Sequence, residues 1–338
     1  MGKRLIICSD GTWNHPDSGY PTNVIKTARA IRTRSPDGSD QVVFYHRGVG
    51  AGPGSDRLAG GAFGNGIDRN IQDAYRFLVH NYTPGDAIFL LGFSRGAFTV
   101  RSLAGLIRNC GLLKKARGGL IPEAYALYRS RHHPDSSRAR RFRALHARPV
   151  RIRFMGVWDT VGALGIPLGL FKRFNVEKYC FHDTRISSII LKAYHAVAID
   201  EKRKSFAPTL WKTRQRRRGT AQVWFAGVHS DVGGGYRETG LADIAWKWML
   251  ARAKENGLSV DRKYIKTTMS GTTRRILHRS LTGAFRVLGR EDRIIGEKNP
   301  ADEYVHRSAV LRLEAVRSYS PRNLRTYLEE TIPAKITS

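Results

Sequence analysis

Short apolar runs alternate with amphipathic stretches along the chain, and this order restricts the fold more than any other feature. Three runs rich in aliphatic and aromatic residues are predicted to be strands, at 4–9, 41–46 and 87–91. Apolar residues at helical spacing predict helices at 24–31, 68–81 and 98–108. Strands and helices that alternate in this way form a mostly parallel sheet with helices on both faces. The sequence therefore predicts an α/β protein.

The pattern continues in the second half of the chain, with two basic interruptions. Two further strands are predicted at 152–157 and 222–226, with helices at 191–197 and 241–253. A basic insertion at about 114–149 is expected to form helices over the ligand-binding edge of the sheet. A basic extension follows at about 259–338. Because no linker rich in proline or serine is found, we expect one domain over 1–338.

The charge of the chain concerns its partners more than its fold. Its 338 residues include 58 Lys and Arg against 28 Asp and Glu, a formal net charge of +30, and 41% are hydrophobic. This composition excludes a disordered chain, and no apolar run approaches the roughly 20 residues that span a bilayer. An anionic membrane and a nucleic acid are the two candidate partners. A soluble protein with solvated arginine-rich faces is the simpler alternative.

Neither cysteine nor histidine spacing indicates a metal or a disulfide framework. Cys8, Cys110 and Cys180 are odd in number and show no C-x-x-C spacing, which fits a reducing cytoplasm. The glycines at 48–66 match neither common nucleotide-binding pattern. We therefore expect no cofactor and a cytoplasmic location, with peripheral membrane contact as an option.

One motif points to chemistry. Gly92-Phe93-Ser94-Arg95-Gly96 matches G-x-S-x-G, and it lies between a predicted strand and a predicted helix. In a nucleophile elbow the serine occupies a strained turn at this place, and small residues fit on either side because the backbones crowd there. The alternative is that Ser94 merely caps a helix. The strand–turn–helix context favours the nucleophile.

A serine nucleophile needs a base and an acid, which α/β-hydrolases supply in the chain order serine, acid, histidine. Asp159 follows the strand at 152–157, and His229 follows the strand at 222–226 within a glycine-rich loop. The predicted triad is therefore Ser94, Asp159 and His229. Asp159 as a helix cap and His229 as an ordinary loop histidine remain alternatives. Asp231 is the rival acid, with His306 as its natural base.

The reaction also needs two backbone N–H groups directed at the developing oxyanion. One is expected from Arg95, the residue after the nucleophile. The second is expected from Gly11 or Thr12, in the loop after the first strand. A simple turn closed by the Asp10 side chain is the competing interpretation of that loop.

Four motifs in order carry a family resemblance: SDGTWN at 9–14, GFSRGA at 92–97, GVWDTVG at 156–162 and VHSDVGG at 228–234. Over about residues 3–250 the chain resembles a largely uncharacterised α/β-hydrolase domain family. Its best-known members are type VI secretion lipase effectors that act as phospholipases A. A weaker similarity continues at 305–308 and 319–324. In contrast to the effector members, we expect no large C-terminal module for membrane anchoring.

The resemblance implies an α/β-hydrolase-like fold and a serine hydrolase whose triad falls on Ser94, Asp159 and His229. We therefore expect a hydrolase of carboxylic esters, with a lipid or small ester as substrate. The rival hypothesis is a non-catalytic protein that binds nucleic acid on a hydrolase scaffold, through runs such as the one at 213–218. No nucleic-acid-binding motif supports it.

Overall fold

The computed structural model describes most of the chain. The described residues are 2–12, 14, 17, 19–48, 60–130, 132–162, 185–212, 217–269, 276–287, 289–297, 300–330 and 335–338. Cys180 and most of the glycine-rich stretch at 48–66 lie outside them, as do four residues of the basic run at 213–218.

An eight-stranded parallel sheet forms the centre of the fold, in the order β10-β9-β8-β7-β6-β3-β1-β2. Its strands are β1 Arg4–Ser9, β2 Gln41–His46, β3 Ala87–Phe93, β6 Ile152–Trp158, β7 Ala193–Ala198, β8 Thr220–Phe225, β9 Glu303–His306 and β10 Ile336–Thr337. Every pairing between them is parallel. This confirms the α/β-hydrolase-like fold class, and it places the loops that follow the strands at a common edge.

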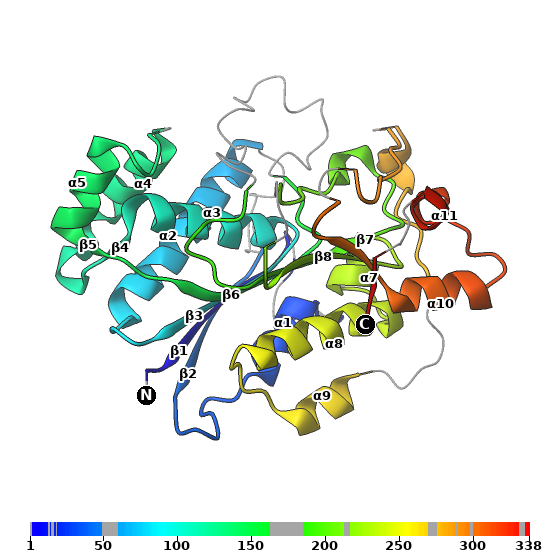
Figure 1. The fold of residues 1–338 in the computed structure, drawn as a ribbon, viewed down its shortest axis with the longest axis horizontal. Helices are drawn as coiled ribbons and strands as arrows, with labels where there is room; N and C mark the ends of the chain where they lie inside the picture. The colour runs from blue at the N-terminus through cyan, green and yellow to red at the C-terminus, as the bar shows by residue number, and fades with distance from the viewer. Residues whose placement is uncertain are drawn as a thin grey trace.

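Helices cover both faces of this sheet (Figure 1). They are α1 Asn23–Ala30, α2 Gly60–Asn81, α3 Arg95–Cys110, α4 Ile121–Arg129, α5 Ser137–His146, α7 His229–Gly233, α8 Gly240–Glu255, α9 Arg262–Thr268, α10 Arg307–Ala315 and α11 Arg322–Glu330. Short 3-10 helices occur at η2 Lys115–Leu120, η4 Lys204–Phe206 and η5 Gly283–Arg286.

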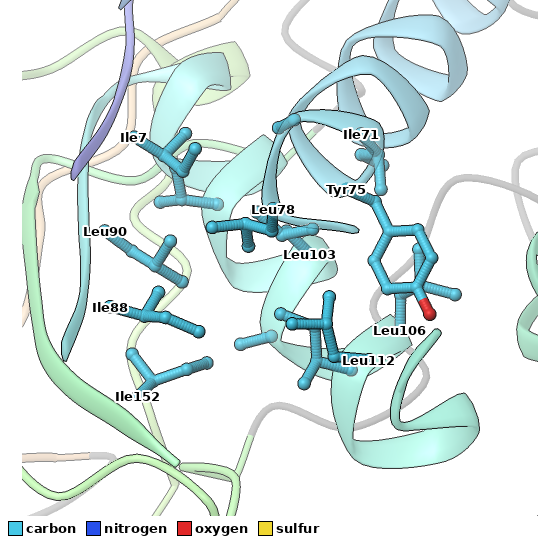
Figure 2. Close-up of a cluster of buried hydrophobic side chains, with 14 of the residues drawn as sticks. Ile7, Ile71, Tyr75, Leu78, Ile88, Leu90, Leu103, Leu106, Leu112 and Ile152 are labelled. Atoms are coloured by element: carbon cyan, nitrogen blue, oxygen red, sulfur yellow. The ribbon is translucent and has the colours of Figure 1, made fainter. Parts of the chain in front are cut away.

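The apolar side chains of β1 alternate between the two faces. Leu5 and Ile7 pack with α2, α3 and α4, whereas Ile6 and Cys8 pack with α1 and α8. All four are fully buried. Figure 2 shows the first of these clusters, in which Ile7, Ile88, Leu90 and Ile152 of the sheet face the side chains of α2 and α3. Burial on both faces explains why these strands have continuous apolar sequences.

One predicted element is wrong. The sequence predicts a helix at 191–197, but 193–198 form the strand β7, between β6 and β8. Five of its six residues are buried, and only Tyr194 is partly exposed. A short apolar run that is buried on both faces cannot be distinguished from a buried helix by its periodicity.

The basic insertion is helical, but its expected position over the ligand-binding edge is also wrong. Its helices α4 and α5 pack against α3, beside the sheet (Figure 1). The insertion begins and ends in a small antiparallel pair, β4 Leu112–Leu113 and β5 Ala147–Arg148. This pair lies between the end of α3 and the start of β6. The insertion therefore extends from the edge of the sheet opposite to the one where β3 and β6 end.

The basic C-terminal region contributes to the sheet itself. Within 259–338 the chain adds β9 and β10 beside β8, and α10 and α11 pack against these strands. None of the helices in the described ranges is both long and apolar enough to cross a bilayer. Cys8 and Cys110 are buried free thiols.

Candidate active site

Ser94 occupies a strained turn between β3 and α3. Its backbone has φ 56° and ψ −120°, a left-handed conformation that residues other than glycine rarely adopt. The glycines on either side are required by crowding. A Cβ on Gly96 would lie 2.1 Å from the carbonyl oxygen of Ser9, and one on Gly92 would lie 2.6 Å from that of Gly96. The motif thus has the geometry of a nucleophile elbow.

The structure brings Ser94, His229 and Asp159 together at the carboxyl ends of β3, β8 and β6. The His229 Nε2 atom lies 2.9 Å from Ser94 Oγ, and its Nδ1 atom lies 2.5 Å from Asp159 Oδ2. All three side chains are buried. Ser94 makes no side-chain capping bond to α3, so its hydroxyl interacts with the imidazole and not with the helix.

Burial and charge set the protonation states at this site. Burial lowers the pKa of His229, although its hydrogen bond to Asp159 opposes the shift. Burial alone would raise the pKa of Asp159, but the charge of Arg293 and the His229 hydrogen bond bring it well below its usual range. At neutral pH the site therefore contains a neutral imidazole beside an ionised carboxylate.

Arg293 is a site residue that the sequence analysis did not find. Its Nη1 atom lies 2.6 Å from Asp159 Oδ1, and its Nη2 atom lies 3.0 Å from Oδ2, a bidentate contact inside the protein. No motif surrounds this residue, and it lies 134 positions along the chain from its partner. The local sequence contains no signal that could have identified it.

A second buried carboxylate supports the backbone of the histidine. Glu201 Oε2 accepts a hydrogen bond of 3.2 Å from the His229 backbone N–H, and Oε1 accepts one of 2.7 Å from the Ser280 hydroxyl. Arg203 contacts both carboxylate oxygens, at 2.9 and 2.8 Å. Burial opposes ionisation of Glu201, but Arg203 dominates and lowers the pKa of this carboxyl to about 2.

Two phenylalanine rings enclose the imidazole of His229. The Phe93 ring centroid lies 4.6 Å from that of the imidazole, and the Phe206 centroid lies 5.0 Å away in an edge-on arrangement. The Arg203 guanidinium lies 3.5 Å from the Phe206 centroid. These contacts restrict the imidazole to the orientation that faces Ser94.

The loop after β1 lies against the elbow. A Cβ on Gly11 would lie 3.2 Å from Ser94 Cβ, and the Gly11 N–H donates a 2.7 Å hydrogen bond to Asp10 Oδ1. Asp10 is buried and also accepts hydrogen bonds from the hydroxyls of Thr22 and Tyr45. Burial raises the pKa of Asp10 to about 6, and these bonds oppose the shift. Asp10 thus holds the loop next to the serine.

The rival acid and base do not meet. Asp231 Oδ1 lies 2.6 Å from His278 Nδ1, and its Oδ2 accepts a 3.0 Å hydrogen bond from the Val228 N–H. His306 instead caps α10, where its Nδ1 lies 2.7 Å from the Ser308 hydroxyl, and its ring stacks on Phe225. The structure therefore pairs Asp231 with His278 and His306 with Ser308, and does not bring Asp231 and His306 together. Over the described part of the chain, no cluster of His, Cys, Asp or Glu is suited to hold a metal.

A parallel sheet covered by helices on both faces, with a serine elbow at the carboxyl end of a central strand, defines the class as α/β-hydrolase-like. Comparison with known families gives a narrower assignment. The chain belongs to the family described as "T6SS, Phospholipase effector Tle1-like, catalytic domain", whose model matches residues 3–252. Arg293 and the neighbouring C-terminal contacts lie outside this match.

Three individual relatives resemble the chain. The "Uncharacterized protein YEL023C" of Saccharomyces cerevisiae is 30% identical over 230 residues, which are 61% of this chain and 32% of that protein. A crystal structure of an uncharacterized protein from Pseudomonas aeruginosa is 19% identical, covers 78% of this chain and 47% of its own, and has a TM-score of 0.49. The structure of the Tle1 effector bound to the VgrG spike from the type 6 secretion system is 20% identical, covers 71% and 52%, and has a TM-score of 0.41.

Proposed function

We propose that the protein is a serine hydrolase of carboxylic esters and that lipid acyl esters are its substrate class. The observation that carries this proposal is the hydrogen-bonded series from Ser94 Oγ to His229 and Asp159, with bonds of 2.9 and 2.5 Å. An imidazole so placed can remove the proton that makes a serine hydroxyl a poor nucleophile. The lipid part of the proposal is supported by membership of a phospholipase effector family.

In the proposed reaction, Ser94 Oγ attacks the acyl carbon while His229 Nε2 takes its proton. The carbonyl oxygen becomes an oxyanion, which accepts hydrogen bonds from the backbone N–H groups of Arg95 and Thr12. Thr12 is preferred to Gly11 because the Gly11 N–H already donates to Asp10. The imidazolium, held by Asp159, then protonates the departing alcohol, and the acyl group stays on Ser94.

Water completes the cycle. His229 Nε2 takes a proton from water as its oxygen attacks the acyl-enzyme, and the same imidazolium returns that proton to Ser94 Oγ as the carboxylic acid leaves. Each proton that His229 accepts is thus donated again within the same half-reaction.

The proposal is tested by measuring hydrolysis of a short-chain p-nitrophenyl ester and of phosphatidylglycerol vesicles. We expect turnover by the wild type and a loss of about 10⁴-fold or more in Ser94→Ala, as in other serine hydrolases without their nucleophile. Ser318→Ala, at an exposed serine, serves as the matched control and should keep full activity. Equal turnover by the wild type and Ser94→Ala would contradict the proposal.

Nucleic-acid binding on an inactive scaffold is the second hypothesis, and the same samples address it. Within the basic run at 213–218, the Arg217 guanidinium donates to the carbonyls of Ser187 and Ile190, so this side chain has a structural role. An inactive wild type that binds DNA with strong salt dependence would favour this hypothesis.

A further inference from the structure

The strongest observation outside the proposed triad is the environment of Arg293. Its guanidinium makes four hydrogen bonds, two to Asp159 and one each to the carbonyl oxygens of Ala198 and Phe206, both at 2.7 Å. Its side chain is 3% exposed and that of Asp159 is fully buried. The guanidinium is planar, and its bonds to the two carbonyl oxygens fix its position. Its two parallel bonds to Asp159 then hold that carboxylate in one orientation.

We propose that Arg293 is a positioning residue for the reaction, which aims Asp159 at His229 and keeps it ionised. This inference rests on the proposed function. Asp159 Oδ2 receives both His229 Nδ1 and Arg293 Nη2, whereas Oδ1 receives Arg293 Nη1 and the Ala198 N–H at 3.0 Å. The carboxylate therefore has partners at both oxygens, and only one of them is the imidazole.

The charge of Arg293 matters because Asp159 is fully buried. A buried carboxylate with no cation nearby tends to take up a proton, since desolvation penalises its charged form. A protonated Asp159 would no longer stabilise the imidazolium that forms when Ser94 attacks. Arg293 supplies the compensating charge without contacting the serine itself.

Two neighbouring contacts show that the C-terminal segment supports the whole site. The Ser280 hydroxyl donates to Glu201, which holds the His229 backbone, and His278 lies 2.6 Å from Asp231 in α7. Together with Arg293, these residues connect 278–293 to the loops after β6, β7 and β8. The active centre thus depends on chain beyond the residues 3–252 of the family match.

The test compares Arg293→Met, Arg293→Lys and the matched control Arg290→Met. Arg290 is exposed and lies three positions before Arg293 in the sequence. Its guanidinium forms an ion pair with the exposed side chain of Asp292. We expect kcat/KM to fall about 100-fold in Arg293→Met, mostly through kcat, because a displaced catalytic group costs about this much. Arg293→Lys should recover part of the loss, and Arg290→Met should match the wild type.

Two readouts separate positioning from simple loss of structure. The acid limb of the pH profile of kcat/KM should move to higher pH in Arg293→Met, because the pKa of the buried Asp159 then rises. Added methylguanidine should restore part of the activity of Arg293→Ala, which a globally misfolded protein would not show. The low-field proton resonance of the His229–Asp159 hydrogen bond reports the same change without any substrate.

The outcomes are distinguishable. Unchanged kcat/KM, an unmoved acid limb and an unmoved proton resonance in a folded Arg293→Met variant would overturn the inference and leave the proposed function intact. Absence of Ser94-dependent turnover in the wild type would refute the proposed function, and the proton resonance would still decide whether Arg293 orients Asp159. Loss of activity that is restored neither by methylguanidine in Arg293→Ala nor by the Arg293→Lys substitution would also count against positioning.

Discussion

At the scale of single residues, the carboxylates of Asp159 and Asp231 make different contacts near His229. Asp159 lies at a positive φ of 36° after β6, where its carboxylate faces both His229 and Arg293. Asp231 lies two residues beyond His229, yet it caps the start of α7 through the Val228 N–H and faces His278. Asp231, the nearer of the two to His229 in the sequence, is therefore the carboxylate that caps a helix. Asp159, which is distant in the sequence, is brought to the imidazole by the order of the strands.

This division predicts the effect of two matched substitutions. Asp159→Asn should lower kcat by about 10⁴-fold, because an amide favours the wrong imidazole tautomer. Asp231→Asn should lower kcat less than about tenfold, because Asp231 contacts the Val228 N–H and His278 and not the imidazole of His229. Steady-state kinetics and urea denaturation on both variants provide the measurement. Full activity in Asp159→Asn would reverse the assignment of the acid.

The protonation of His229 predicts a pH dependence. The imidazole must be neutral to accept the serine proton, and burial lowers its pKa from the ordinary value. As the pH rises through this lowered pKa, kcat/KM should increase, with half of its maximum reached below about pH 6.5. Asp159 stays ionised over this range because its own pKa is lowered as well. Tryptophan fluorescence over the same range controls for unfolding, and a midpoint above 6.5 would contradict the prediction.

At the scale of elements, a buried ion pair joins α1 to α8. Lys26 Nζ lies 2.7 Å from Asp243 Oδ1, and their side chains are 1% and 5% exposed. The ammonium also lies 4.6 Å from the centroid of the Trp246 ring. Burial lowers the pKa of Lys26, and Asp243 opposes this shift. The Thr22 hydroxyl, at the N-cap of α1, donates to Asp10, and the Asn23 amide of α1 donates to the Val232 carbonyl of α7, so the pairing of α1 with α8 supports the site.

Removing one partner of this pair should be costly. Lys26→Met is expected to reduce the free energy of unfolding by about 3–5 kcal/mol, because it leaves Asp243 buried without its cation. The double variant Lys26→Met/Asp243→Leu should recover most of this loss, since an apolar pair carries no desolvation cost. Lys247→Met, at an exposed position of α8, is the control and should change little. Urea denaturation measures all three, and equal stability of the single and double variants would contradict the argument.

Elements were predictable from sequence where a local signal decides them. The strands β1, β2, β3, β6 and β8 and the elbow follow from apolar runs and turn residues. The strand β7 could not be predicted in this way, because its apolar run is also compatible with a buried helix. Only its pairing between β6 and β8 distinguishes the two. For the same reason β9 and β10 escaped prediction, as they are short and join the sheet only through long-range pairing.

At the scale of the whole molecule, some residues of the site could be predicted from the sequence and others could not. Ser94, Asp159 and His229 each follow a strand, so the order of a parallel sheet brings them to one edge. Arg293, Glu201 and Ser280 reach that edge from segments with no motif, and only the folded chain determines their contacts. Side chains that support a catalytic group are chosen by three-dimensional fit, which a single sequence does not display.

Part of the large positive charge of the chain lies on the basic insertion. An exposed group of basic side chains, which we call the basic insertion surface, lies at η2 and on α5: Lys114, Lys115, Arg117, Arg138, Arg140 and Arg141. The Lys114 N–H donates to the His146 carbonyl, so η2 and the end of α5 are neighbours. Leu145 of α5 is 55% exposed beside them. Cations around an exposed aliphatic side chain suit contact with an anionic membrane.

This arrangement predicts selective binding to anionic vesicles. Each Lys or Arg near such a surface contributes about 1 kcal/mol, and the attraction weakens as salt rises. The triple variant Arg138→Glu/Arg140→Glu/Arg141→Glu should bind phosphatidylglycerol vesicles at least about 100-fold less tightly in sedimentation, while p-nitrophenyl ester hydrolysis stays unchanged. Arg307→Glu/Arg322→Glu/Arg325→Glu alters three exposed arginines of α10 and α11 at the opposite end of the molecule (Figure 1). Because both triple variants change the net charge equally, equal losses would show that overall charge, and not the basic insertion surface, governs the contact.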